Sequence, residues 1–243
     1  MFSTHKRRSW LGGGFHRATT AQRERLLALC REQDTPGWLQ QHGSRLPRQL
    51  RTLIDHEDRA VAISDFQPML VPGLLQTAEY AHALIRETVN VPPSEVDDRV
   101  ATRLARQSLF ARERPARFSY YLHELALRLP VGGPVVMREQ LQHLLRMSER
   151  PYLSLRVVPA ARGGHAGIAG AFMLMEFAEF KPVAYLDSET ACLFLERSEE
   201  IAAYRRILAA LARTALGEGE SRELIAALAT ELDADGEDHD DRA

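Results

Sequence analysis

The sequence predicts an α+β fold: N-terminal helices, a small mostly antiparallel sheet with packed helices, and two C-terminal helices. Apolar residues recur at helical spacing before residue 117, whereas short alternating or β-branched segments are clustered between 117 and 196. Two amphipathic segments then close the chain. Because the strand-like segments do not alternate regularly with helices, a doubly wound α/β fold is not favoured.

The first half of the chain is predicted to be helical. One helix is expected over 20–33 and a second from about Leu46 to Ser64, where Glu57 falls on the apolar stripe. Pro68 and Pro72 end that helix because proline has no N–H to donate and restricts the preceding residue. A third helix is expected over 77–86.

The helix after residue 93 has a clear start. Ser94 is the expected N-cap, acidic residues follow in the first turn, and arginines come later. The strand candidates that follow are 117–125, 152–159, 170–177, 182–188 and 190–196, with a helix within 131–149 and closing helices over 198–216 and 217–232.

Composition limits the class of protein. The 243 residues are 45% hydrophobic with a net charge of −2, so no global charge points to nucleic acid or to a membrane surface. No apolar run is long enough to span a membrane, and the basic N-terminus lacks the apolar segment of a signal peptide. Two cysteines make no disulfide framework, so we expect free thiols in a cytoplasmic protein.

The loop 161–167, ARGGHAG, is the most chemically suggestive loop. Its glycines could bring backbone N–H groups and His165 close to a ligand. The alternative is a flexible hairpin connection between two strands. No Lys-Ser/Thr follows the glycines, so the loop is not a phosphate-binding P-loop.

His123, Glu124 and Arg128 lie together in a second polar stretch. Glu124 and Arg128 are spaced for an i, i+4 ion pair on a helix. No second histidine stands at metal-ligand spacing, and His165 is isolated in the sequence, so we predict no metal site. No cofactor motif is present, and no cofactor is predicted.

Arg99, Arg103 and Arg106 share one face of a predicted helix. Such a stripe could bind an anion or line a pocket. The alternative, which the pattern favours, is a solvated face whose arginines pair with nearby acidic residues.

Several motifs in order resemble a known family. They are DHEDRAVAISDFQPMLVPGLLQTAEYA, DDRVATRLARQ, HELALRLPVGGPVVMREQLQHLL, LRVVPAARGGHAGIAGAFMLMEF, AYLDSETACLFLE and ESRELIAAL. Over residues 20–232 the chain resembles the C-terminal domain that follows an XRE-type helix-turn-helix in actinobacterial, antitoxin-like regulators. Such regulators are typically encoded beside a small partner protein.

The uneven charge of the two ends, taken together with the resemblance, divides the chain into four segments. These are a basic disordered arm (1–19), a helical connector (20–66), an α+β sensor-like domain (67–232) and an acidic disordered tail (233–243). The family's DNA-binding unit has about sixty residues, and the nineteen residues before the connector are too few for it. We therefore expect no direct sequence-specific DNA binding and no membrane association, unless the start codon lies further upstream.

Two functions follow as expectations. The first is a regulatory protein without its own DNA-binding unit, which binds a small molecule or a small partner protein, or forms homo- or hetero-oligomers with full-length relatives, and influences transcription indirectly. The alternative is a cofactor-independent enzyme recruited from the same domain in natural-product biosynthesis. Predicted catalytic residues, for an enzyme, are Glu124 and His165. Predicted ligand-binding residues are Gln76, Arg103, Arg106, Arg128 and Tyr185.

Overall fold

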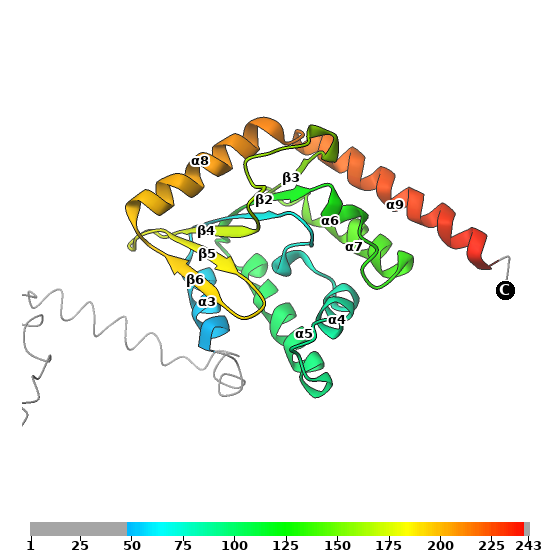
Figure 1. The fold of residues 1–243 in the computed structure, drawn as a ribbon, viewed down its shortest axis with the longest axis horizontal. Helices are drawn as coiled ribbons and strands as arrows, with labels where there is room; N and C mark the ends of the chain where they lie inside the picture. The colour runs from blue at the N-terminus through cyan, green and yellow to red at the C-terminus, as the bar shows by residue number, and fades with distance from the viewer. Residues whose placement is uncertain (1–47, 241–243) are drawn as a thin grey trace, which may run out of the picture. The chain divides into compact units, whose positions relative to one another are not determined.

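A six-stranded sheet is the centre of the structure (Figure 1). The structure is a computed structural model that describes residues 48–240, with side chains as far as residue 232. The strands lie in the order β3-β2-β1-β4-β5-β6. Their bounds are β1 Ala62–Gln67, β2 Arg117–His123, β3 Leu153–Val158, β4 Phe172–Glu176, β5 Val183–Asp187 and β6 Cys192–Leu195.

The sheet is mixed, so the expectation of a mostly antiparallel sheet is wrong, although the α+β class holds. β1 pairs parallel with β2 and β2 pairs parallel with β3, whereas the pairs β1–β4, β4–β5 and β5–β6 are antiparallel. The parallel half arises because helices connect β1 to β2 and β2 to β3. A parallel pair needs such a crossover, while the antiparallel half needs only short turns.

Seven α-helices surround the sheet within the described residues. They are α3 Arg48–Arg59, α4 Ala78–Arg86, α5 Val96–Ala105, α6 Leu125–Arg128, α7 Pro134–Met147, α8 Ser198–Thr214 and α9 Glu218–Asp240. Short 3₁₀ turns, η2 Gly73–Leu75 and η4 Arg106–Ala111, flank α4 and α5. None of the helices in this part of the chain combines the length and apolar character that crossing a bilayer requires.

The starts of α4 and α5 differ in how they are capped. The Thr77 hydroxyl accepts a hydrogen bond from the Tyr80 N–H and caps α4, as expected for that position. Ser94 does not cap α5. A 3₁₀ turn over Pro93–Glu95 precedes the helix, so α5 begins at Val96 with Glu95 as its N-cap.

Two predicted boundaries are wrong. The helix expected from about Leu46 to Ser64 ends at Arg59, and β1, a central strand of the sheet, lies inside the segment predicted as a helical connector. At the other end, α9 continues to Asp240, into the tail predicted to be disordered. The basic arm (1–19) and the rest of the connector up to residue 47 lie outside the described residues.

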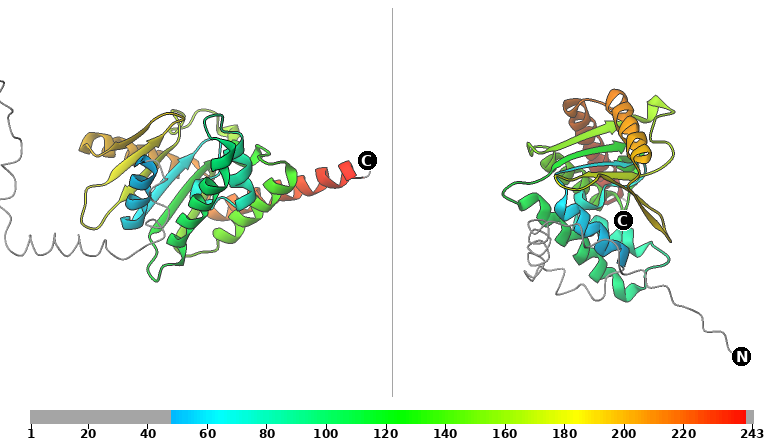
Figure 2. Two further views of the ribbon diagram at one scale, coloured as in Figure 1. Left: turned by 90° about the horizontal axis from the view of Figure 1, so that it is seen from below. Right: turned by 90° about the vertical axis from the view of Figure 1, so that its left-hand side faces the viewer.

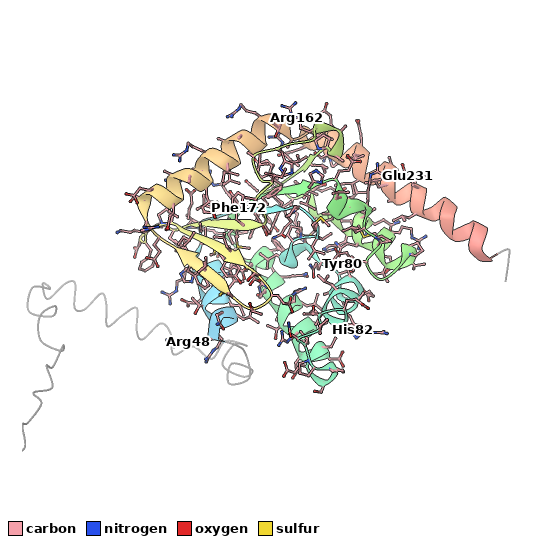
Figure 3. The ribbon with its side chains drawn as sticks, in the orientation of Figure 1. Arg48, Tyr80, His82, Arg162, Phe172 and Glu231 are labelled. Atoms are coloured by element: carbon pink, nitrogen blue, oxygen red, sulfur yellow. The ribbon has the colours of Figure 1, made fainter. Side chains whose placement is uncertain are left out.

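The sheet has two differently covered faces. Ser64 and Phe66 of β1 lie on the face that packs against α8, which we call the upper face, whereas Ile63 and Asp65 lie on the opposite, lower face. Figure 2 (right) shows α8 above the sheet and α3 and α5 below it. Phe172, labelled in Figure 3, packs on Phe66 in the core of the upper face, with ring centroids 6.1 Å apart.

Candidate functional site

Polar side chains gather on the lower face, where an apolar core would be expected. In the strand register Tyr120 of β2 lies beside Asp65 of β1; Met173 of β4 lies on the other side of Asp65 and beside Tyr185 of β5. Side chains from α3, α5 and the neighbouring 3₁₀ turns lie against these strand residues on the lower face. We call the set the polar cluster. It consists of Glu57, Asp65, Gln76, Arg103, Arg106, Tyr120, Tyr185 and Asp187.

A buried ion pair anchors the polar cluster. Arg106 donates from Nε to Glu57 Oε2 at 2.8 Å and from Nη2 to Oε1 at 2.5 Å. The side chains are 9% and 1% exposed, respectively. Burial alone would lower the pKa of Arg106, but Glu57 raises it above its ordinary value. The two charges therefore neutralise each other inside the protein, and Arg106 is not a free anion-binding group.

Asp65 is a buried carboxyl without a cationic hydrogen-bond partner among the described residues. It accepts a hydrogen bond from Gln67 Nε2 at 2.9 Å and is 2% exposed. Burial, followed by the negative charge of Glu57, raises its pKa to about 7, although Gln67 and Arg106 act in the opposite direction. Asp65 is therefore a group that can hold or release a proton near neutral pH.

Tyr120 stands next to Asp65 with an unsatisfied hydroxyl. The Tyr120 Oη is fully buried and has no hydrogen-bond partner within the described residues. Burial and the nearby carboxylates raise the pKa of this phenol well above its ordinary value, so it stays protonated. Buried hydroxyls are normally paired, and an unpaired one calls for a water or ligand atom at the site.

Gln76 joins the polar cluster to the backbone below it. Its Oε1 accepts from Arg103 Nη1 at 2.7 Å, its Nε2 donates to the Val71 carbonyl at 2.7 Å, and its own carbonyl accepts from Gln107 Nε2. Gln140 of α7 holds the same turn by hydrogen bonds to the Leu75 carbonyl and the Thr77 N–H. These hydrogen bonds fix the position of Gln76, and Gln76 in turn holds the Arg103 guanidinium.

Arg103 is the least neutralised cation of the polar cluster. It is half-buried, and no carboxylate of the described residues lies within ion-pair distance of its guanidinium. Burial, and then repulsion by Arg106, lower its pKa to about 10, while Asp187 favours the charged form. Its stripe neighbour Arg99 instead forms an exposed ion pair with Glu95 at 3.0 Å.

Tyr185 and Asp187 close the polar cluster on the β5 side. Burial is the largest cause that raises the pKa of each side chain. Asp187 lies at the end of β5 opposite Cys192 of β6, and it is more exposed to solvent than the buried Tyr185. This end of the polar cluster is therefore the end nearest to solvent.

The structure brings four predicted ligand-binding residues together in the polar cluster: Gln76, Arg103, Arg106 and Tyr185. The acidic members Glu57, Asp65 and Asp187 were missed, as was Tyr120. Glu57 carried a signal, because a carboxylate on an apolar helical stripe needs a buried partner. Asp65 was missed because it lies in the segment predicted to be a helical connector, 20–66.

The other predicted site residues, Glu124, Arg128 and His165, lie in a second group near the end of β2. His123 and His165 stack with ring centroids 5.1 Å apart, and His165 meets Phe66 edge-on at 5.5 Å. His165, which is isolated in the sequence, therefore has His123 as a neighbour in space. We call His123, Glu124, Arg128 and His165 the histidine corner.

Glu124 links α6 to the segment after β3 by two hydrogen bonds. It accepts hydrogen bonds from Arg128 Nε at 2.7 Å, which confirms the predicted i, i+4 pair, and from the Ala160 N–H at 2.9 Å. The Ala160 bond is the largest cause of a lowered pKa for Glu124. A carboxylate with two donors and a lowered pKa is a poor general base, so the predicted role of Glu124 in proton abstraction has little support from this geometry.

The loop of His165 is not a hairpin. It joins β3 to β4, and β2 and β1 lie between these strands in the sheet. A Cβ atom at Gly167 would lie 2.4 Å from the Phe66 ring, so the glycine lets the loop pack directly on the upper face. His123 Nδ1 lies 3.2 Å from the Leu125 N–H, and burial lowers the pKa of His123.

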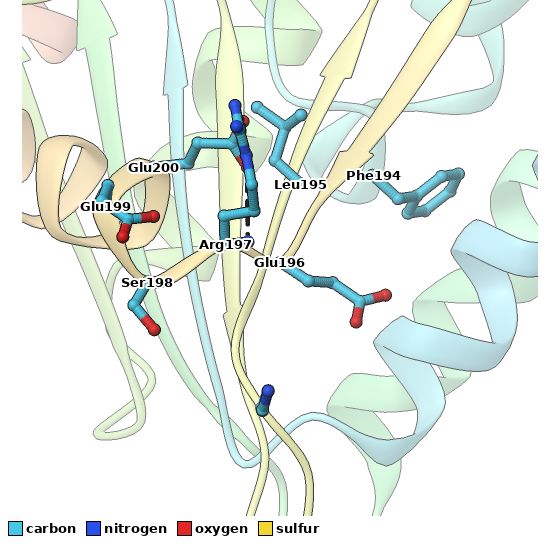
Figure 4. A pocket seen from close by; sticks show the side chains of 8 residues that line it. Phe194, Leu195, Glu196, Arg197, Ser198, Glu199 and Glu200 are labelled. Carbon is cyan, nitrogen blue, oxygen red and sulfur yellow. Dashed lines mark hydrogen bonds and ion pairs between the residues drawn. The ribbon is translucent and has the colours of Figure 1, made fainter.

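Two surface hollows of the described residues are lined by no member of the polar cluster or of the histidine corner. One of about 550 Å³ is lined by Lys181 and residues 194–200 beside β6 (Figure 4). The other, of about 940 Å³, lies between α4, α5 and the segment 130–136, where Figure 3 labels His82. Within residues 48–232, no three His, Cys, Asp or Glu side chains come together as a metal site.

Comparison with known proteins assigns the domain to a family. Residues 50–227, more than half of the chain, match the model of a family described as a domain of unknown function, DUF5753. No curated protein and no solved structure shows a significant match.

Proposed function

This chain belongs to the DUF5753 family, and we propose that it is the ligand-binding module of a regulatory protein in the cytoplasm. The ligand is a small molecule with a carboxylate or phosphate group, which binds at the polar cluster beside Arg103. Its effect on transcription is indirect and passes through a protein partner. The resemblance to antitoxin-like regulators supports the regulatory part of the proposal.

The ligand-binding part of the proposal rests on Arg103, which is partly buried and has no ion-pair partner among the described residues. A guanidinium that is partly removed from water costs free energy unless an anion compensates its charge. The neutral amide of Gln76 supplies a hydrogen bond but no charge, and Arg106 adds repulsion. A carboxylate or phosphate fits this site because it can accept two parallel N–H bonds from one guanidinium.

The other members have supporting roles in this proposal. Arg106 is already neutralised by Glu57, so it positions the polar cluster and does not bind the anion. The Tyr120 hydroxyl and the Asp65 carboxyl offer hydrogen bonds to the uncharged part of the ligand. Such convergent polar groups orient a small molecule and select it against relatives that lack matching groups.

Native mass spectrometry of the chain purified from its native host tests the proposal. We expect the wild type to retain a small acidic molecule, and the variant Arg103→Met to lose it. Arg99→Met is the matched control, because Arg99 lies one turn away on the same helix and forms only an exposed pair with Glu95. A ligand present at 100 times its Kd would also stabilise the wild type by about 2.7 kcal/mol.

Two results would contradict ligand binding at Arg103. The first is equal retention of the molecule by Arg103→Met and wild type. The second is the absence of a retained molecule together with no thermal shift in a panel of small carboxylates and phosphates. Transcript levels in a host carrying either variant test the regulatory part: Arg103→Met should change them as a deletion does, and Arg99→Met should not.

Asp65 favours a second candidate function, a cofactor-independent enzyme. A buried carboxyl with a pKa of about 7, next to an unpaired phenol, can transfer a proton at neutral pH. In this case Asp65→Asn would abolish conversion of the retained molecule and leave its binding intact. If Asp65→Asn and wild type leave the molecule equally unchanged, the chain binds it without a reaction.

A further inference from the structure

Arg103 and Asp187 border a common space at the solvent end of the polar cluster. Asp187 lies on the lower face of β5 with Tyr185, two residues before it, and Arg103 comes from α5 beneath the sheet (Figure 2). Burial is the largest influence on the pKa of both charged groups and disfavours their charged forms, but their mutual attraction opposes it. The two charges therefore lie within electrostatic range of each other.

No ion pair closes the space between them. Within the described residues, the charged groups of Arg103 and Asp187 do not come within ion-pair distance. Each has a neutral partner instead. Gln76 accepts from Arg103 Nη1 at 2.7 Å, and the Tyr185 phenol is the strongest influence that favours the charged form of Asp187. The space is thus bounded by one positive and one negative group, and direct contact neutralises neither.

Arg103 has two donor groups left for a ligand. Its Nη1 is bonded to Gln76, whereas its Nε and Nη2 bond to no described residue and are not among the fully buried unpaired atoms. These two groups can donate in parallel to one carboxylate, and Arg106 uses the same two to hold Glu57. A Cβ atom at Gly73 would lie 3.9 Å from Arg103 Nε, so the glycine leaves this side of the guanidinium uncovered.

A ligand with only negative charge fits this space poorly. Bound to Arg103, it would lie close to the like charge of Asp187, and repulsion would offset part of the attraction. A ligand that also carries an ammonium group replaces this repulsion with a second attraction. Arg106 does not change the balance, because Glu57 already neutralises it. The charges therefore favour a molecule that is negative at one end and positive at the other.

We propose that the ligand is an amino carboxylate. Its carboxylate accepts from Nε and Nη2 of Arg103, and its ammonium group donates to the Asp187 carboxylate. Asp187 is the more exposed of the two residues, so the amine lies at the solvent end and the carboxylate lies deeper. This inference rests on the proposed function, because it takes Arg103 as the anion site, and it adds the chemical class of the ligand.

Isothermal titration calorimetry of the full chain with matched pairs of ligands tests the inference. Each pair is an amino acid and the same acid without its amine, such as leucine with isocaproate, β-alanine with propionate, or γ-aminobutyrate with butyrate. The members of the series differ in the distance between their two charges, so the series also measures the width of the space. We expect the preferred amino carboxylate to bind with a Kd about tenfold or more below that of its amine-free partner.

Substitution of Asp187 should move the two ligands of the preferred pair in opposite directions. Asp187→Asn removes the partner of the ammonium group, so the amino carboxylate should bind about tenfold more weakly. The same change removes the repulsion of the amine-free acid, which should bind more tightly than it binds to the wild type. A misfolded variant would weaken both ligands, so this result separates ligand recognition from a loss of structure.

Two further variants complete the comparison. Arg103→Met should abolish the binding of both ligands, because both present a carboxylate to Arg103. Glu189→Gln is the matched control for Asp187→Asn. It removes a nearby exposed carboxylate in the turn after β5, and the amide oxygen can still accept the hydrogen bond from Asn90. Both Kd values should be unchanged in this control.

Three results would overturn the inference, and they differ in what they leave standing. If both members of every pair bind the wild type equally and Arg103→Met binds neither, Arg103 is an anion site and the amine plays no part. If Asp187→Asn prefers the amino carboxylate as strongly as the wild type does, Asp187 does not recognise the amine. If no ligand of the series binds, or if Arg103→Met binds as the wild type does, the proposed function fails as well.

Discussion

The polar cluster and the histidine corner each contain a carboxylate paired with an arginine, but the two pairs differ in burial and in origin. Glu57 and Arg106 are 49 residues apart in sequence and almost fully buried, at 1% and 9% exposure. Glu124 and Arg128 are four residues apart, and their side chains are 13% and 44% exposed. The first pair depends on the tertiary fold, whereas the second would form on an isolated helical turn. Burial therefore determines what the loss of one partner costs.

The polar cluster also contains a contrast between its two buried acids. Glu57 has two charge-assisted hydrogen bonds from Arg106, whereas Asp65 has a single neutral partner, Gln67. Burial raises the pKa of Asp65 to about 7. A buried charge that is paired can remain charged, and one that is not paired tends to take up a proton.

The largest predicted effect comes from breaking the buried pair. Glu57→Leu should lower the free energy of unfolding by about 3–5 kcal/mol at pH 7, because Arg106 would remain buried and charged without a partner. Urea denaturation measures this loss. The double variant Glu57→Leu, Arg106→Met should recover part of it.

A matched control lies on the same helix. Asp55→Ala removes the exposed pair with Arg59 and should cost less than about 1 kcal/mol. If Glu57→Leu costs no more than Asp55→Ala, the buried pair does not have the importance assigned to it.

The next effect is pH-dependent and concerns Asp65. A pKa raised from about 3.8 in the unfolded chain to about 7 means that the folded state binds the proton more tightly. Its contribution to stability is therefore full at low pH and falls as pH rises toward 7. Asp65→Asn removes this dependence and should gain up to about 4 kcal/mol on the wild type between pH 4 and pH 8.

Urea denaturation of both proteins across this pH range gives the measurement. The difference between the two curves should grow steadily from pH 4 and level off near pH 8. A constant difference across the range would show that Asp65 is ionised throughout.

Gly167 tests the packing at the histidine corner. Gly167→Ala would place a methyl group 2.4 Å from the fully buried Phe66 ring, so the loop or the ring must move. Overpacking of this kind costs about 1–3 kcal/mol. Gly164→Ala meets nothing within 4 Å and should leave the thermal midpoint unchanged. Equal thermal midpoints for the two variants would contradict the close contact.

The smallest effect is expected for Glu124. Glu124→Gln weakens the bonds to Arg128 and to the Ala160 N–H and should cost about 1–2 kcal/mol at pH 7. Because the pKa of Glu124 is lowered in the folded state, this contribution is present at neutral pH and is lost as the carboxylate is protonated in acid.

Chemical denaturation at pH 7 and pH 3 measures the difference, with the exposed Glu149→Gln as control. A variant that is equally destabilised at both pH values would show that shape, and not charge, is the reason Glu124 matters.

Periodicity and end signals in the sequence were enough to predict the elements with strong local patterns. The strands β2 to β6 and the helices α4, α7 and α8 lie where alternation, helical spacing and turn residues placed them. The Glu124–Arg128 pair was predictable for the same reason, since four residues span one helical turn. The arginine stripe was also visible, but the partners of Arg103 and Arg106 were not.

Only the tertiary structure decided the direction of the strands, the place of β1 and the contents of the polar cluster. β1 follows α3 so closely that its apolar residues extend the helical pattern, and its pairing with both β2 and β4 is what makes it a strand. The expected His165 hairpin became a crossover because β1 and β2 lie between β3 and β4. Glu57 finds Arg106 across 49 residues. A local pattern reports the conformation of a segment, whereas pairing and burial depend on which distant segments the whole chain brings together.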